Sequence, residues 1–203
     1  MKRLENKIAV ITGASTGIGR ASAQVLANEG AHVLALDIAD ELESTVADIN
    51  NNGGKATAYK VDISDDKQVQ DFADQAKKEY GRIDVIFNNA GVDDNAGRIH
   101  EYPVEVFDKI MAVDMRGTFL VTKFLLPLMM ENGGSIINTS SFSGQAADLY
   151  RSGYNAAKGA VINFTKSIAI EYGRENIRAN AIAPGTIAVS YTHLRAHETG
   201  RNL

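Results

Sequence analysis

Short apolar runs alternate along the chain with longer segments of helical periodicity. The runs are apolar at nearly every position, which is typical of parallel strands that are covered on both faces. We predict six such strands, at residues 7–12, 32–37, 56–61, 83–88, 135–140 and 177–183. The alternation of strand and helix predicts an α/β fold in which a doubly wound parallel sheet carries helices on both faces.

The segments between the predicted strands carry start and stop signals of helices. Several end in glycine, the residue that most readily adopts the left-handed conformation at a helix C-terminus. These glycines are Gly30, Gly53, Gly54, Gly81, Gly133, Gly134 and Gly173. A helix start is predicted at Ser64, where a hydroxyl cap would be followed by the carboxylates of Asp65 and Asp66 near the positive end of the helix dipole.

Length and composition restrict the class of protein. The 203 residues suffice for one substantial core, and a hydrophobic fraction of 44% with a charged fraction of 23% is typical of globular proteins, so we expect a single domain. The net charge of −4 and the scattered Lys and Arg argue against a nucleic-acid partner. The absence of cysteine excludes disulfides and thiolate metal sites and agrees with a cytoplasmic location.

No membrane partner is expected. The most apolar helical stretch, residues 119–130, is too short to cross a bilayer and contains Lys123 and Pro127. The chain also lacks a basic amphipathic segment of the kind that binds membrane surfaces. We therefore interpret residues 119–130 as a helix that is buried in the core or faces another subunit.

A glycine-rich turn follows the first predicted strand. Gly13, Gly17 and Gly19 stand between that strand and the next helix. Glycine lets the backbone turn tightly and approach a pyrophosphate, while the helix N-terminus offers free N–H groups and the positive end of its dipole. A tight turn without a ligand would use the same residues, but the strand before it and the helix after it favour a dinucleotide site.

Asp37 ends the second predicted strand. An acidic residue near this distance from the glycine-rich turn accepts hydrogen bonds from the adenosine ribose of a dinucleotide. A carboxylate there would repel the 2′-phosphate of NADP, and neither Ile38 nor Ala39 supplies a compensating cation. We therefore expect NAD in preference to NADP, although a surface aspartate at a strand end would look the same in the sequence.

Polar side chains are predicted to converge at the edge of the sheet where the cofactor would lie. Tyr154 and Lys158 are four residues apart in a helical segment and therefore share one face. Ser140 and Ser141 end the fifth predicted strand. A Tyr and a Lys at this spacing are usually plain surface neighbours, and it is the serines at the same edge that favour a catalytic site.

The chemistry of such a site depends on the pKa of Tyr154. A free tyrosine has a pKa near 10, so a base that works at neutral pH needs a pKa lower by about two or three units. One ammonium about 4 Å away contributes roughly 4 kcal/mol at an effective dielectric constant near 20, which suffices. Lys158 is therefore expected to lower the pKa of Tyr154, which would exchange a proton with the substrate oxygen as hydride moves between the substrate carbon and a nicotinamide.

The chain resembles the short-chain dehydrogenase/reductase family. The resemblance covers residues 5 to about 187 and rests on five motifs in order, TGASTGIG, NNAG, NTSS, YNAAK and NAIAPG. It implies a three-layer Rossmann domain with strand order 3-2-1-4-5-6, in which Ser141 orients the substrate, Tyr154 is the acid/base, and Lys158 holds the nicotinamide ribose and lowers the pKa of Tyr154. The residues implied to line the cofactor are Gly13, Ser15, Gly17, Ile18, Gly19, Asp37, Asp62, Ile63, Asn89, Ala90, Gly91, Tyr154, Lys158, Pro184, Gly185 and Ile187.

One position departs from the family pattern inside the catalytic group. In VDMRG, Asp114 stands where the family usually has Asn, whose implied role is to hold a water in the proton relay from Lys158. An ionised Asp accepts hydrogen bonds but cannot donate them. We expect Asp114 to belong to the catalytic group and the relay to run through backbone groups and water.

Other polar features carry less weight. The loop at residues 93–100 follows NNAG and could touch substrate, but a solvated loop is the simpler interpretation. His32 and His100 have no second ligand nearby in the sequence, so no metal site is expected. The sequence does not identify the substrate.

Residues 188–203 do not continue the pattern. The family usually has a Thr where Val189 stands, then a substrate-covering loop, a helix and a last strand. His193 and His197 are four residues apart, but no Glu of an H-E-x-x-H motif lies between them and no third ligand is evident. Residues 189–199, VSYTHLRAHET, equal the translated end of a transposase-based sequencing adapter. We therefore expect a domain at residues 1–187 that lacks the family's last strand, and a non-native tail at 188–203.

These features predict an oxidoreductase that transfers a hydride between NAD(H) and a small secondary alcohol or ketone. An NADPH-dependent 3-oxoacyl-(acyl carrier protein) reductase is an alternative, opposed mainly by Asp37. A non-catalytic NAD-binding or scaffolding protein is an alternative of another class, opposed by the catalytic group. The segments 103–131 and 150–173 are apolar on more than one face, and relatives pair these helices, so a homodimer or homotetramer of the full-length form is expected. Core packing accounts for that pattern equally well.

Overall fold

The computed structural model describes residues 2–94 and 96–185. Its strands are β1 (Ile8–Thr12), β2 (His32–Asp37), β3 (Lys55–Lys60), β4 (Val85–Asn88), β5 (Gly134–Thr139) and β6 (Ile177–Ile182). Its α-helices are α1 (Gly17–Asn28), α2 (Leu42–Asn51), α3 (Asp66–Tyr80), α4 (Val104–Ile110), α5 (Thr118–Leu125), α6 (Ser143–Ala146) and α7 (Ser152–Glu171). Shorter helices are the 3₁₀ segments η1 (Ile99–Glu101), η3 (Leu126–Leu128) and η4 (Gly173–Glu175), and the π-helix η2 (Met111–Gly117).

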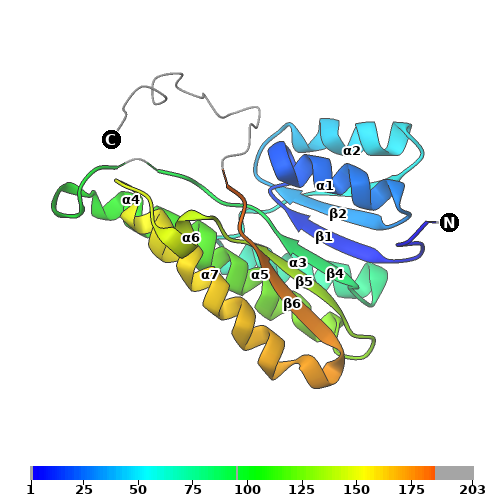
Figure 1. Cartoon of the computed structure of the whole chain (residues 1–203). Helices are drawn as coiled ribbons and strands as arrows, with labels where there is room; N and C mark the ends of the chain where they lie inside the picture. Colours follow the sequence, from blue (N-terminus) through cyan, green and yellow to red (C-terminus); the bar gives the residue numbers. More distant parts are fainter. Residues whose placement is uncertain (1, 95, 186–203) are drawn as a thin grey trace.

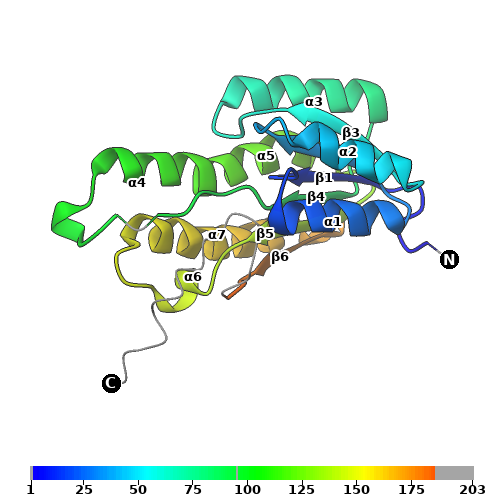
Figure 2. The same cartoon turned by 90° about the horizontal axis from the view of Figure 1, so that it is seen from above.

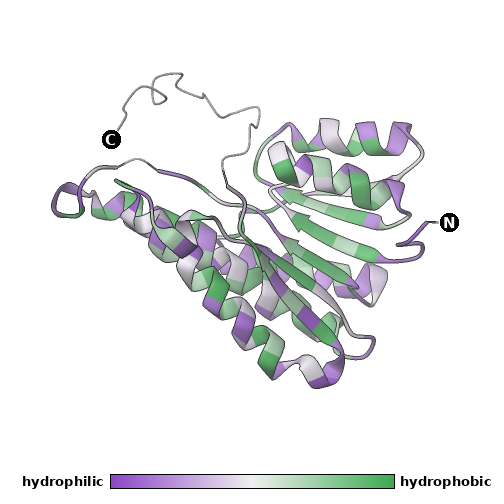
Figure 3. Cartoon of the chain, in the orientation of Figure 1, coloured by the Kyte–Doolittle hydropathy of each residue, from purple (hydrophilic) through white to green (hydrophobic). Residues whose placement is uncertain are grey.

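The six strands form one parallel sheet in the order β3-β2-β1-β4-β5-β6. This confirms the predicted doubly wound sheet and its strand order, and each predicted strand overlaps an observed one. The predicted domain end at residue 187 and the tail at 188–203 lie outside the described residues. β1 and β2 are apolar along most of their length, whereas β6 and the helices mix apolar and polar positions (Figure 3).

Helices cover both faces of the sheet and divide the core in two. One cluster packs α1 and α2 against β1 and β2, with Ala9, Ile11, Ala23 and Val46 among its buried residues. The other packs α3, α5 and α7 against the opposite face. Figures 1 and 2 show this layering, with α1 and α3 on opposite sides of β1. The fold is therefore the predicted three-layer α/β/α domain.

The predicted glycine stops hold at the ends of α1, α2 and α3 and in the turn before β5, and fail after α7. Gly30, Gly53, Gly81 and Gly133 have φ angles of 98°, 79°, 72° and 67°, in the left-handed region. Gly173 does not take this role. The chain after α7 enters η4 at Gly173, and Asn176 adopts the left-handed conformation instead, with φ of 57°. Asn is the residue after glycine that tolerates this conformation best.

The predicted cap at Ser64 is also wrong by one residue. Asp65 is the N-cap of α3, and its carboxylate accepts hydrogen bonds from the N–H groups of Lys67 and Gln68. Ser64 instead donates its hydroxyl to Asp62 Oδ1 at 2.7 Å. Both side chains can cap a helix, and the carboxylate is stabilised further by the helix dipole.

The predicted helix at residues 103–131 begins as α4 and continues through η2 into α5 and η3. Pro127 lies at the start of η3, where its missing N–H group disturbs no helical hydrogen bond. The π-helix η2 in the middle contains Asp114, and π-helical segments occur frequently at functional sites. Within residues 2–94 and 96–185 we find no helix with the length and hydropathy needed to span a membrane.

Candidate active site

The predicted catalytic residues meet at the carboxyl edge of the sheet. Tyr154 and Lys158 lie near the start of α7, and Ser141 is the second residue after β5. All strands of a parallel sheet end at one edge, so these residues lie on the side of the sheet that also carries the glycine-rich turn after β1. Figure 1 shows the start of α7 beside α4, beyond the strand ends, and the two helices are in contact.

Lys158 is held inside the protein. Its side chain is 4% exposed, and its ammonium donates a hydrogen bond to the Thr139 carbonyl oxygen at 3.0 Å. Asp114 Oδ2 lies 3.0 Å from Lys158 Nζ and supplies the opposite charge. A buried ammonium needs such a partner because an unpaired charge is strongly disfavoured in a medium of low dielectric constant. These contacts fix the ammonium in one place, whereas the ammonium of a surface lysine moves freely in water.

Asp114 is fully buried and approaches Lys158 from η2. Its other oxygen, Oδ1, accepts a hydrogen bond from the Val92 N–H group at 2.8 Å. Burial raises the pKa of Asp114, while the Lys158 ammonium and the Val92 N–H act in the opposite direction. The structure thus brings Asp114 to the predicted catalytic group as an ion-pair partner of Lys158. The relay of protons through backbone groups and water stays a prediction.

The expected fall of the Tyr154 pKa is not found. Burial raises the pKa of the Tyr154 hydroxyl above its ordinary value, and a hydrogen bond with Ser141 lowers it. The carboxylates of Asp93 and Asp114 raise it further. Lys158 Nζ lies 5.5 Å from the centre of the Tyr154 ring, and its charge is offset by the carboxylate 3.0 Å away. The Lys158 ammonium is therefore not the isolated charge that the predicted fall of the Tyr154 pKa requires.

The two serines after β5 are distinguished by their surroundings. Ser140 is buried, and its hydroxyl donates a hydrogen bond to the Lys158 carbonyl oxygen at 2.8 Å, which ties β5 to α7. Ser141 is partly exposed, and its Oγ accepts a hydrogen bond from the Ser143 N–H at 3.2 Å. The Ser141 hydroxyl also acts on the pKa of Tyr154. Ser141 is thus the serine placed beside Tyr154, and Ser140 has a structural role.

The glycine-rich turn packs closely against the end of β4. Gly13 and Gly17 have φ angles of 67° and 53°, in the left-handed region. A Cβ atom on Gly13 would lie 2.8 Å from Ala90 Cα, and one on Gly19 would overlap the Gly13 carbonyl oxygen. The close packing confirms the need for glycine in a tight turn, and the dinucleotide site stays a prediction. The turn needs glycine for its own packing, and the same lack of side chains leaves its backbone open to a ligand.

Hydrogen bonds join Asp37 to the glycine-rich turn. Asp37 Oδ2 accepts from the Ser15 N–H at 2.9 Å, and Oδ1 accepts from the N–H groups of Ile38 and Ala39 at 2.7 and 3.1 Å. The Ser15 Oγ is buried and has no hydrogen-bond partner within the described part of the chain. An orphaned hydroxyl between β1 and α1 fits a polar oxygen of a bound nucleotide.

The other residues implied to line the cofactor follow the carboxyl ends of three strands. They are Asp62 and Ile63 after β3, Asn89, Ala90 and Gly91 after β4, and Pro184 and Gly185 after β6. Ile18 lies in the first turn of α1. Ile187 lies outside the described residues. Some of these positions also hold the backbone together, since the Pro184 carbonyl oxygen accepts a hydrogen bond from the Phe142 N–H at 3.0 Å.

An ion pair that the sequence does not predict lies beside Tyr154. Asp93 and Arg151 lie 3.2 Å apart, and their charges act on the pKa of Tyr154 in opposite directions. Next to this pair, both carboxylate oxygens of Asp94 are buried, so the prediction of a solvated loop is wrong at this residue. No signal along the sequence links the loop after β4 to the start of α7. Only the folded chain brings them together.

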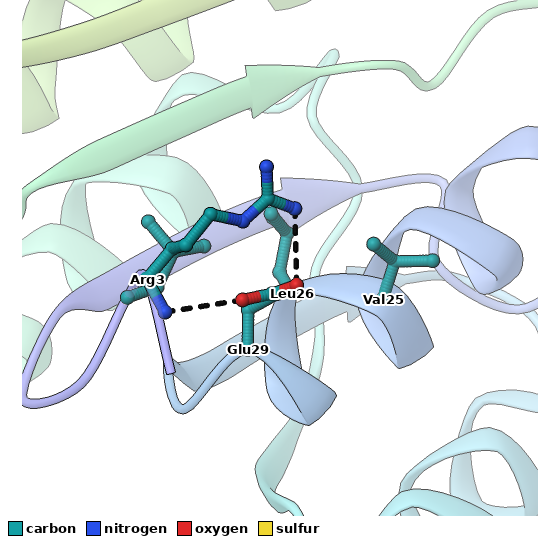
Figure 4. Close-up of a pocket in the computed structure, with 5 residues that line it drawn as sticks. Arg3, Val25, Leu26 and Glu29 are labelled. Atoms are coloured by element: carbon teal, nitrogen blue, oxygen red, sulfur yellow. Dashed lines mark hydrogen bonds and ion pairs between the residues drawn. The ribbon is translucent and has the colours of Figure 1, made fainter. Parts of the chain in front are cut away.

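A shallow pocket lies at the opposite edge of the sheet. Leu4, Val25 and Leu26 line it, together with Arg3 and Glu29, which form an ion pair at 3.0 Å (Figure 4). This pocket is at the amino end of β1 and the C-terminal end of α1. None of the predicted site residues lines it, and ligands of doubly wound sheets bind at the other edge.

Known proteins that resemble this chain are oxidoreductases. The profile of the family described as short chain dehydrogenase matches residues 7–199. The uncharacterized oxidoreductase YxbG of Bacillus subtilis is 63% identical over 188 residues, which are 92% of this chain and 69% of that protein. Meso-2,3-butanediol dehydrogenase of Serratia marcescens is 38% identical over 191 residues, 94% of this chain and 75% of that protein. The crystal structure of NAD⁺-bound xylitol dehydrogenase superposes with a TM-score of 0.88 at 33% identity, over 91% of this chain and 72% of that one. The chain therefore belongs to the short-chain dehydrogenase family.

Proposed function

We propose that this chain transfers a hydride between NAD(H) and a secondary alcohol or ketone, with Tyr154 as the acid/base. The observation that supports this best is the arrangement at the start of α7. Tyr154 and Lys158 share one face, Ser141 follows β5 beside them, and the glycine-rich turn lies at the same sheet edge. A non-catalytic NAD-binding protein has no need for this group. The similarity to a butanediol dehydrogenase agrees with an alcohol or ketone substrate.

The proton steps follow from the chemistry of these side chains. In the reductive direction the Tyr154 hydroxyl gives its proton to the carbonyl oxygen while hydride reaches the carbonyl carbon. In the oxidative direction the tyrosinate takes the proton of the alcohol. Ser141 has a hydroxyl that can donate to the same substrate oxygen and so orient it. The resemblance to the family supports these roles.

The residues around the glycine-rich turn fit a nicotinamide dinucleotide. NAD supplies the hydride acceptor, and NADH the hydride donor. The orphaned Ser15 hydroxyl and the side-chain-free backbone at Gly13 suit the phosphates. Asp37, whose carboxylate is held by the Ser15 N–H, would accept hydrogen bonds from the adenosine ribose and repel a 2′-phosphate. The structure of a relative with NAD⁺ bound agrees with NAD as the cofactor.

The decisive experiment compares Tyr154→Phe with the parent protein. The assay follows nicotinamide absorbance with a panel of secondary alcohols, diols and ketones and with NAD(H) and NADP(H). We expect turnover to fall by about 10²- to 10⁴-fold, the usual contribution of general acid–base catalysis, while NAD binding is retained. Tyr172→Phe, a change of the same kind just beyond α7, is the matched control and keeps parent turnover. Parent-level turnover in Tyr154→Phe would refute the proposed role.

The cofactor preference is tested at Asp37. Asp37→Ser removes the charge and keeps a hydroxyl. A charge-assisted hydrogen bond contributes about 1.5–3 kcal/mol, so we expect kcat/KM with NAD to fall by about 10- to 100-fold and kcat/KM with NADP to rise. Asp40→Ser, a nearby exposed carboxylate that pairs with Lys60, is the control and changes neither value appreciably. A parent enzyme that prefers NADP would contradict the proposal.

A further inference from the structure

The buried pair of Asp114 and Lys158 has no net charge, and Lys158 Nζ lies 5.5 Å from the centre of the Tyr154 ring. The side chains of Asp114 and Lys158 are 0% and 4% exposed, and their charged atoms are 3.0 Å apart. Water therefore neither separates nor screens these charges. At the position of Tyr154, the attraction that the ammonium exerts on a tyrosinate is opposed by the repulsion that the carboxylate exerts.

The geometry leaves the pair little freedom. The Lys158 ammonium is held between Asp114 Oδ2 and the Thr139 carbonyl oxygen, each 3.0 Å away. The carboxylate is held in turn by the Val92 N–H, which donates to Oδ1 at 2.8 Å. A Cβ atom on Gly91 would come within 3.0 Å of Lys158 Nζ and 3.1 Å of Asp114 Oδ2. The backbone after β4 therefore closes tightly over the pair.

The remaining groups that face Tyr154 do not restore a positive field. Asp93 lies in the loop after β4 and Arg151 at the start of α7. These two residues form their own ion pair at 3.2 Å. From the segment after β5 comes the Ser141 hydroxyl, which is neutral. The pKa of Tyr154 agrees with this balance. Burial raises it most, Ser141 lowers it, Asp93 and Asp114 raise it, and Arg151 lowers it.

We propose that Asp114 is a positioning residue whose carboxylate fixes the Lys158 ammonium and offsets its charge, which keeps Tyr154 in its protonated, proton-donating form through neutral pH. This inference rests on the proposed function, because the proton in question is the one that Tyr154 gives to a carbonyl oxygen. This role predicts that ketone reduction proceeds over a broad pH range. Alcohol oxidation, which needs the tyrosinate, becomes efficient only at alkaline pH.

Asp114→Asn tests the proposal with little change of shape. The amide retains an oxygen for the Val92 N–H but loses the charge. An opposite charge nearby shifts a pKa by about 1 to 3 units, so release of the Lys158 charge should lower the Tyr154 midpoint by about 1 to 2 units. The alkaline limb of the reduction profile and the acid limb of the oxidation profile then move to lower pH together. A merely structural role of Asp114 would lower turnover at every pH and move neither limb.

A second readout does not need turnover. The ultraviolet absorbance of tyrosinate is titrated in each protein without cofactor and compared with that of its Tyr154→Phe counterpart, so that the difference isolates Tyr154 among the seven tyrosines. The proposal predicts a midpoint above the ordinary value of a free tyrosine in the parent protein and a lower one in Asp114→Asn. A parent midpoint near neutrality would overturn it, even if the Asn variant does not fold.

Asp84→Asn is the matched control, because Asp84 is also a buried aspartate paired with a lysine, at the other edge of the sheet. It should lose stability without moving the Tyr154 midpoint.

The two proposals fail in different ways. A parent protein without turnover refutes the proposed function, and the absorbance titration still tests Asp114. Turnover with an unchanged midpoint in Asp114→Asn refutes the role of Asp114 alone.

Discussion

Two buried aspartates of this protein pair with lysines at opposite edges of the same sheet, and the two pairs behave differently. Asp84 precedes β4 and pairs with Lys7 at 2.9 Å, whereas Asp114 lies in η2 and pairs with Lys158 at 3.0 Å. The side chain of Lys7 is 48% exposed, and that of Lys158 is 4% exposed. The pairs differ less in distance than in the access of water to the lysine.

The pKa values of the two carboxyl groups shift in opposite directions. Burial raises the pKa of Asp84, but hydrogen bonds from Lys7 and the Ile8 N–H more than compensate, and the net shift is downward. Burial also raises the pKa of Asp114, and there it outweighs Lys158 and the Val92 N–H. An Asp–Lys pair thus stabilises the fold at the amino edge of the sheet. At the carboxyl edge, where the chemistry is proposed, an Asp–Lys pair lies beside the proposed acid/base.

The largest expected difference comes from removal of the lysines. Lys158→Met leaves Asp114 buried and unpaired, and breaking a buried pair in this way costs about 3 kcal/mol of the free energy of unfolding. Lys7→Met should cost about 1 kcal/mol, because Asp84 keeps the Ile8 N–H at 2.9 Å and water can reach the vacated side. Urea denaturation of both variants and the parent measures the difference. Equal losses would mean that water access does not distinguish the two pairs.

A glycine beside each pair gives the next largest contrast. A Cβ atom on Gly134 would lie 2.6 Å from the Asp84 carbonyl oxygen, so Gly134→Ala forces backbone apart and should cost about 1–3 kcal/mol of stability. A Cβ on Gly91 would lie 3.0 Å from Lys158 Nζ, a side-chain atom rather than backbone, so Gly91→Ala should cost less stability. It should lower turnover instead, by about tenfold, because it displaces the ammonium. Unfolding and hydride-transfer assays on both variants separate these effects, and a loss of turnover in Gly134→Ala alone would reverse the assignment.

The fold was predictable because its signals are local. Continuous apolar runs identified all six strands, and glycine stops were correct at Gly30, Gly53, Gly81 and Gly133. The stop at Gly173 failed because a nearby Asn, three residues on, takes the left-handed turn after η4.

The candidate site was predictable in its members but not in its electrostatics. Tyr154 and Lys158 are four residues apart, so their shared face follows from helix geometry alone. The distance between Lys158 and Asp114 depends on η2, whose π-helical turn changes the direction of its side chains, and no spacing in the sequence predicts it. The sequence therefore placed both Lys158 and Asp114 in the catalytic group, but it did not show that their charges pair at 3.0 Å.

The pH dependence of stability should differ in sign between the pairs. Asp84 has a folded pKa below its unfolded value near 4, so its contribution is present above about pH 4 and is lost as the pH falls through the folded pKa. Asp114 has a raised folded pKa, so its contribution is present below about pH 4 and is lost as the pH rises through the folded pKa. Thermal unfolding of Asp84→Asn and Asp114→Asn against the parent should show opposite slopes of about 1 kcal/mol per unit of pKa shift. Parallel slopes would contradict the assigned directions.

The smallest expected effect comes from an arginine near each pair. Arg82 lies 3.4 Å from Asp84, and Arg151 acts on Tyr154 while it pairs with Asp93. Arg151 and Asp93 are both partly exposed, so their charges are screened and contribute less than about 1 kcal/mol. Arg151→Gln should therefore raise the Tyr154 midpoint by less than about one unit, and the shift should shrink at high salt, where the Debye length falls to about 3 Å. Arg82→Gln should leave that midpoint unchanged. Asp114 is fully buried, so the shift of the Tyr154 midpoint in Asp114→Asn should persist at the same high salt concentration. If that shift disappeared at high salt, the charge of Asp114 would have to be accessible to solvent.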